Sequence, residues 1–140
     1  MVQIIAGSKG KGKTKILLDK VNTKVKESSG TIVYLDKNSK HMYELKNKIR
    51  LINTSEFPFS TTEEFFGFLC GIVSQDHDLQ EVYLDSFMDI AFIKDKSLIE
   101  GIFDKFDRIS TQFDVDFVIS ISLEADEVPE KYKSSVIVSL

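Results

Sequence analysis

Short apolar runs of β-forming residues alternate with segments of helical periodicity along almost the whole chain of 140 residues. Strands that are separated by helices pair in parallel, because a parallel connection needs a long crossover, and the helices then cover both faces of the sheet. Several runs are apolar at nearly every position, which is typical of strands buried on both faces. We therefore predict a three-layer α/β fold with a mostly parallel sheet of about five to six strands.

The predicted elements follow one another without a linker rich in Pro, Gly or Ser, so we expect residues 1–140 to form one compact domain. Ser60-Thr-Thr-Glu63 is typical of a helix capping box and precedes an apolar run. The predicted helices are 14–26, a short polar helix over 39–47, the apolar run 65–73 and the amphipathic segment 98–113. The predicted strands are 2–6, 31–35, 49–53, 82–84, 116–121 and 135–140.

The segment between the first strand and the first helix carries the strongest functional signal. It matches the pattern G-x-x-x-x-G-K-[ST] at every fixed position, and it has the strand before it and the helix after it that the pattern needs. Glycines let backbone N–H groups surround a phosphate, and the N-terminus of the helix attracts the same anion. A glycine- and lysine-rich surface loop is the alternative, which this context disfavours. The residues expected to bind phosphate are Gly7, Ser8, Lys9, Gly10, Lys11, Gly12, Lys13 and Thr14.

With this Walker A motif the chain resembles the P-loop NTPases. The resemblance implies a P-loop fold, ATP or another nucleoside triphosphate, and Mg²⁺ held by Thr14 and by an acidic Walker B residue that ends an apolar strand. Two strands end in Val-Tyr-Leu-Asp, at Asp36 and at Asp85. In the RecA-like division the Walker B strand is separated in sequence from the P-loop strand, which favours Asp85. Asp36 stays open as the alternative, because some kinase-type members place Walker B directly after the P-loop helix.

Catalytic groups are less clearly marked. Lys13 would act on the phosphates, and Glu56 and Asp89 are the candidates for orienting the attacking water, since both follow predicted strands. Ser120 and Ser122 fit either a contact to the third phosphate or simple alternation in a strand.

The chain has only two arginines, Arg50 and Arg108, and neither is placed to act as an arginine finger. Turnover should therefore be slow unless a partner or a lysine supplies the cation that stabilises the transition state.

The predicted function is that of an ATP-binding P-loop protein, a slow Mg²⁺-dependent NTPase. The alternatives are a nucleotide-sensing module that signals to a protein partner without hydrolysis, and a small kinase. The whole chain is similar to short stand-alone ATP-binding proteins sometimes labelled after the twitching-motility ATPases. Only the Walker A segment and one Walker B-like strand carry this likeness, so it implies the superfamily and not the motor function.

Composition limits the partners. Residues 1–50 hold 12 of the 18 Lys and Arg but only 4 of the 22 Asp and Glu. Most of these cations belong to the phosphate loop and its helix, and the chain is acidic with a pI near 5.2, so nucleic acid is disfavoured. The single cysteine, Cys70, excludes an internal disulfide. No apolar run is long enough for a membrane span or a signal peptide, so we expect a cytoplasmic protein. A protein partner or a homo-oligomer stays open.

Overall fold

A six-stranded sheet forms the centre of the computed structural model, which describes residues 1–140. The strands follow the order β3-β2-β4-β5-β1-β6 across the sheet, and every neighbouring pair is parallel. This confirms the α/β class and the strand number expected from the sequence. The strands are β1 (Val2–Ala6), β2 (Thr31–Asp36), β3 (Ile49–Asn53), β4 (Leu79–Leu84), β5 (Asp116–Ile121) and β6 (Val136–Ser139).

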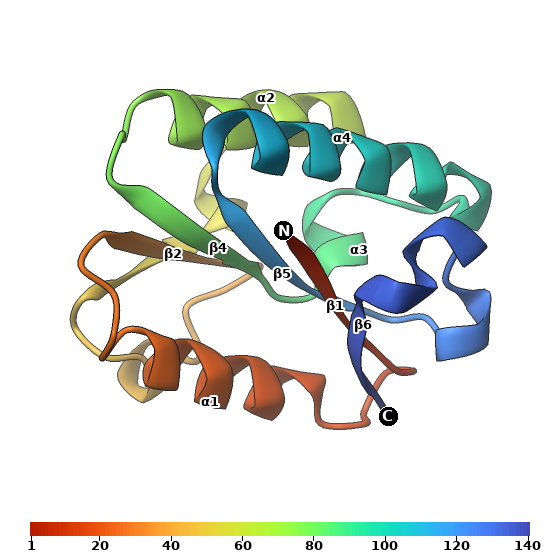
Figure 1. Cartoon of the computed structure of the whole chain (residues 1–140), viewed down its shortest axis with the longest axis horizontal. Coiled ribbons are helices and arrows are strands. Elements are labelled where there is room, and N and C mark those ends of the chain that lie inside the picture. The colour runs from red at the N-terminus through yellow and green to blue at the C-terminus, as the bar shows by residue number, and fades with distance from the viewer.

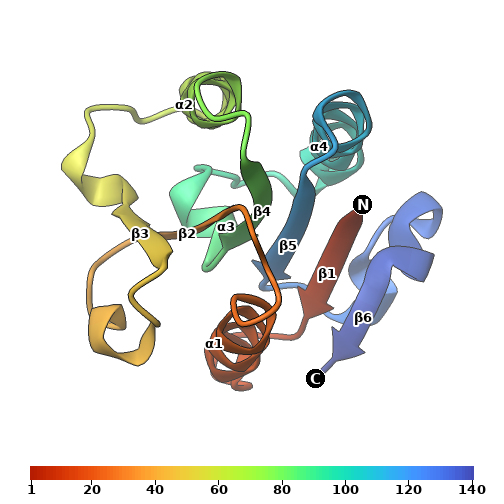
Figure 2. The same cartoon turned by 60° about the vertical axis from the view of Figure 1, so that its left-hand side comes forward.

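Helices cover both faces of this sheet. Helix α1 (Lys13–Lys24) lies on one face, and α2 (Thr62–Ser74) and α4 (Ile99–Phe113) lie side by side on the other (Figures 1 and 2). A core cluster of 11 buried residues lies on the α1 side, and a cluster of 27 lies on the other side. The periodicity of α4 puts Phe103 and Phe106 into the larger cluster, where both are fully buried.

The remaining helical segments are short. Helix α3 (Phe87–Ile90) directly follows β4, and the 3₁₀ turns connect other elements. The longest helix, α4, has 15 residues, and no helix combines the length and apolar character that crossing a membrane requires. The 3₁₀ turns are Met42–Glu44, Thr54–Glu56, Lys96–Leu98, Ala125–Glu127 and Glu130–Ser135.

Two local predictions need correction. The polar helix predicted over 39–47 is reduced to the 3₁₀ turn Met42–Glu44, because none of its three residues is buried to hold a longer helix against the sheet. The capping box lies one residue later than predicted. The Thr61 hydroxyl accepts from the N–H of Glu64, and the Glu64 carboxylate accepts from the N–H of Ser60. The helix therefore starts one residue further along the chain than the pattern indicates.

Parallel pairing brings the carboxyl ends of the central strands to one edge of the sheet. Ala6 of β1 pairs with Ile121 of β5, and Leu35 of β2 pairs with Leu84 of β4. The segments that follow these four strands therefore leave the sheet next to one another. In open α/β sheets this edge is where ligands bind.

Candidate functional site

The loop between β1 and α1 takes a backbone course that glycine alone adopts easily. Gly10 and Gly12 have φ values of 82° and 88°, in the left-handed region. Gly12 is the N-cap of α1, and no side chain caps this helix end. The first backbone N–H groups of a helix have no partner within the helix, so this end of α1 presents free donors to the loop. The sequence-predicted phosphate loop thus has the geometry of an anion cradle.

Lys13 lies at the base of this loop. Its Nζ donates to the carbonyl oxygens of Gly7 and Ser8, at 2.7 Å and 2.9 Å. The residue is only 8% exposed. Burial lowers the pKa of the Lys13 ammonium from its ordinary value, and the negative charge of Asp85 opposes this effect. The two carbonyl contacts hold the cation beside the free N–H groups of the loop.

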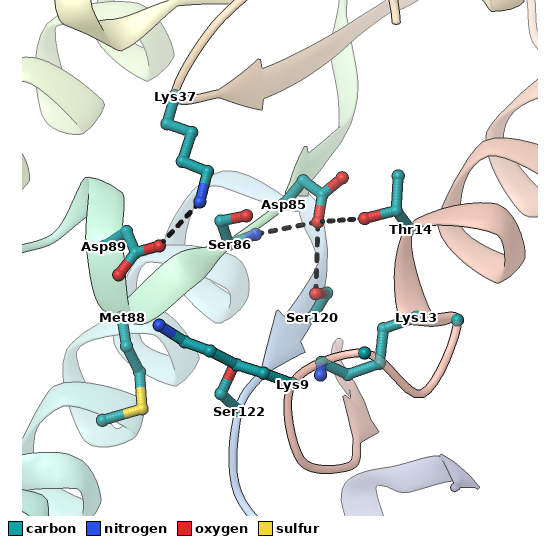
Figure 3. Close-up of a pocket in the computed structure, with 12 residues that line it drawn as sticks. Lys9, Lys13, Thr14, Lys37, Asp85, Ser86, Met88, Asp89, Ser120 and Ser122 are labelled. Carbon is teal, nitrogen blue, oxygen red and sulfur yellow. Dashed lines mark hydrogen bonds and ion pairs between the residues drawn. The ribbon is translucent and has the colours of Figure 1, made fainter. Parts of the chain in front are cut away.

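Asp85, the residue after β4, is the centre of the polar contacts at this edge (Figure 3). Its Oδ1 accepts from the Thr14 hydroxyl at 3.2 Å, the Ser86 N–H at 2.8 Å and the Ser120 hydroxyl at 3.3 Å. Its Oδ2 accepts from the Tyr34 hydroxyl at 2.9 Å. Asp85 as a whole is 2% exposed, and these donors compensate for the burial of its carboxylate.

Tyr34 is a member of the site that the sequence did not single out. Burial, followed by the charge of Asp85, raises the pKa of its hydroxyl, so the hydroxyl stays a donor. Its ring stacks on Tyr83, with ring centroids 6.5 Å apart. The signal that could have identified Tyr34 is its position in the sequence, two residues before the strand-ending Asp36, where an aromatic side chain carries a hydroxyl.

A cavity of about 300 Å³ opens between the loop and the ends of β2, β4 and β5. The motif residues Gly7, Ser8 and Lys11 are not part of its lining, although Lys13 binds the carbonyls of the first two. Only one of its lining residues, Met88, is hydrophobic, which suits a charged, hydrated ligand. The lining residues are Lys9, Gly10, Gly12, Lys13, Thr14, Lys37, Asp85, Ser86, Met88, Asp89, Ser120 and Ser122.

The two candidate Walker B residues lie in different surroundings. Asp85 reaches the Thr14 hydroxyl, whereas Asp36 is absent from the cavity lining. The Asp36 side chain is buried and accepts from the N–H of Lys37 at 2.7 Å. Burial and then the charge of Asp85 raise the pKa of the Asp36 carboxyl. Asp36 is therefore a buried acid beside the site, at the end of the strand next to the one that Asp85 follows.

The two candidates for orienting water are also separated. Asp89 of α3 lines the cavity and forms an ion pair with Lys37, with Nζ and Oδ2 3.0 Å apart. Glu56 lies in the 3₁₀ turn after β3 and lines a different cavity further along the sheet. Ser86 takes a left-handed conformation with φ 51°, which turns the chain from β4 into α3 and places Asp89 over the cavity.

The protein oxygens suit a metal ion that arrives with phosphate. No group of three or more His, Cys, Asp or Glu side chains is placed to hold a metal. Mg²⁺ in phosphate-binding sites keeps several waters and uses only one or two carboxylates beside the phosphate oxygens. The Thr14 hydroxyl and the Asp85 carboxylate are hard oxygen ligands that already lie within hydrogen-bond distance. The pair fits Mg²⁺ bound together with a phosphate ligand.

The site places cationic and amide donors on one wall of the cavity and carboxylates on its floor and far wall. This arrangement can bind a phosphate chain and its metal ion.

Comparison with models of known protein families finds no match, and no curated protein matches the chain significantly.

Proposed function

We propose that this protein binds a nucleoside triphosphate, ATP, together with Mg²⁺ and hydrolyses it slowly. The observation that carries the proposal is the glycine-rich loop Gly7–Thr14 between β1 and α1, with the Thr14 hydroxyl 3.2 Å from the Asp85 carboxylate. Loop amides and the Lys13 ammonium bind the phosphates, and the first turn of α1 adds its positive end. A free exposed thiol, Cys70, is compatible with the reducing cytoplasm, which is the proposed location.

The finer description of the fold, a P-loop NTPase of the RecA-like division, belongs to this proposal. It is supported by helices on both faces of a parallel sheet and by a loop of the Walker A type after β1. It is also supported by the position of Asp85 at the end of β4, far along the chain from β1. Asp85 takes the Walker B role in this proposal, and Asp36 stays outside the metal site.

Each group of the chain has a separate task. Thr14 and Asp85 hold Mg²⁺, which neutralises charge on the phosphates when it is bound. Ser122 lines the same cavity beyond the end of β5, where a third phosphate would need donors, whereas the Ser120 hydroxyl already donates to Asp85. Asp89 is the carboxylate within the cavity that can orient a water molecule.

Slow turnover follows from the cations present. Arg50 and Arg108 are exposed, and neither lines the cavity. Without an arginine at the transferred phosphate, we expect steady-state hydrolysis below about 0.1 s⁻¹, well under the roughly 1–100 s⁻¹ of kinases. The same observation favours the second candidate function, a nucleotide-sensing module that binds ATP and signals to a protein partner without turnover. Phosphate release from Mg·ATP separates the two functions.

Thermal unfolding tests the binding step. The wild type is unfolded with Mg·ATP, with Mg·GTP and with Mg²⁺ alone, beside Lys13→Ala and the control Lys15→Ala. Lys15 is exposed on the same helix and does not line the cavity. ATP at 100 times its Kd should stabilise the wild type and Lys15→Ala by about 2.7 kcal/mol, and Lys13→Ala far less. If no nucleotide shifts the wild-type midpoint, the proposed function is wrong.

A further inference from the structure

Lys37 and Asp89 form an ion pair at the mouth of the cavity (Figure 3). Lys37 follows β2 directly, and Asp89 belongs to α3. Both side chains line the cavity, and they are 50% and 42% exposed. Exposed pairs of this kind contribute little to stability, because water screens the charges and two flexible side chains must be held. The pair can therefore open at small cost when a stronger anion is present.

The position of Lys37 differs from that of the other cations in the cavity. Lys9 and Lys13 come from the phosphate loop, and Lys13 is held by loop carbonyls. Lys37 comes from the end of β2, which lies three strand spacings from β1, or roughly 14 Å. The ends of β5 and β4, with Ser120 and Asp85, lie between the two walls. A phosphate chain that starts in the loop and extends along these strand ends approaches Lys37 with its terminal group.

We propose that Lys37 distinguishes a nucleoside triphosphate from a diphosphate by exchanging Asp89 for the terminal phosphate. This inference rests on the proposed function, since it concerns the same cavity. The third phosphoryl group adds negative charge and oxygen acceptors, and a lysine ammonium binds such a group as a flexible point charge. Because no arginine lines the cavity, Lys37 is the cation on the far wall that is available for this contact.

Asp89 sets how strongly Lys37 responds. Its carboxylate holds the Lys37 ammonium in place and also repels a phosphate that approaches the same wall. Binding of the triphosphate therefore removes Lys37 from Asp89, whereas a diphosphate that ends nearer the loop leaves the pair intact. Whether a triphosphate or a diphosphate is bound therefore changes the contact made by α3, the segment that carries Asp89.

Binding measurements test this inference. Calorimetric titration with Mg²⁺ and either ADP or a non-hydrolysable ATP analogue compares the wild type with Lys37→Met, Asp89→Asn and the control Lys40→Met. Lys40 is exposed three residues away and does not line the cavity, so its variant makes the same change in net charge. Lys37→Met should lower the affinity for the ATP analogue about tenfold and that for ADP less than about twofold, because one charge-assisted hydrogen bond is lost. Asp89→Asn should raise the preference for the ATP analogue, and that gain should disappear when Lys37→Met is added.

The outcomes separate the two proposals. If the wild type binds neither nucleotide, the proposed function is wrong, and the role of Lys37 is wrong with it. If the wild type binds both and Lys37→Met weakens both equally or behaves like Lys40→Met, nucleotide binding stands and the inference about Lys37 is overturned. Thermal melts followed by circular dichroism check the folding of all variants. Because the Lys37 and Asp89 side chains are exposed, we expect the variants to melt at the same midpoint as the wild type.

Discussion

The hydroxyl of Thr14 donates to Oδ1 of Asp85 across 3.2 Å, although 71 residues separate the two positions in the chain. This contact joins the first turn of α1 to the end of β4 and brings two hard oxygen ligands to one point of the cavity. The metal-dependent part of the proposed function depends on this pair.

Asp85→Asn should abolish the contribution of Mg²⁺ to ATP binding, because the neutral amide is a poor ligand for a hard cation. We expect the thermal shift produced by ATP to be the same with Mg²⁺ and with EDTA in this variant, whereas Mg²⁺ enlarges the shift in the wild type. Asp36→Asn is the matched control, since Asp36 does not line the cavity. If Asp36→Asn instead loses the effect of Mg²⁺, Asp36 is the Walker B residue.

Tyr34→Phe removes the only donor to Oδ2 of Asp85 and should lower the free energy of unfolding by about 1.5–3 kcal/mol. The matched control is Tyr83→Phe, which removes the buried hydroxyl that donates to Glu81 at 2.6 Å. Urea unfolding should show a loss of stability for both variants. Only Tyr34→Phe should weaken Mg·ATP binding, and equal Mg·ATP affinities in the two variants would contradict a role for Tyr34 in positioning Asp85.

Gly12→Ala should lower the free energy of unfolding by about 1–2 kcal/mol, because φ is 88° and an L side chain is strained there. A Cβ at this position would meet no atom within 4 Å, so the cost is conformational and not a clash. Gly67→Ala in α2, also with open space around it, should stabilise the protein by about 0.5–1 kcal/mol. Urea unfolding measures both, and a Gly12→Ala variant as stable as wild type would argue against the left-handed loop.

Asp36 should make stability depend on pH. Its pKa is raised in the folded protein from the ordinary 3.8, so the folded state keeps a proton that the unfolded chain has already lost. The free energy of unfolding should therefore fall as the pH rises from about 3.8 through the folded pKa. Asp36→Asn cannot titrate, so its melting midpoint should exceed that of wild type by more at pH 7 than at pH 4. A difference that is constant between these pH values would show that the Asp36 pKa is not raised.

Local patterns in the sequence were sufficient for most of the secondary structure. The bounds of β1, β3 and β5 were predicted without error, because each is a short apolar run that ends at a polar residue or a turn. The amphipathic helix α4 starts within one residue of its predicted position. The prediction over 39–47 was wrong, because a polar segment without a buried face has no packing energy to keep it helical. Helix α3 was missed, since four residues carry no periodic signal.

The sequence by itself determined the α/β class and the position of the glycine-rich loop after β1, because strand and helix periodicity and glycine-rich turns are local properties of the chain. Tertiary structure decided which distant residues share the cavity. The strand order places β5 beside β1 and β4 beside β5. Asp85 therefore reaches both Thr14 and Ser120, whereas Glu56 lines a different cavity. Tertiary structure also brought Tyr34 to Asp85 and Lys37 to Asp89. The order of strands in a sheet depends on how helices pack on both of its faces, and no local sequence pattern determines this packing.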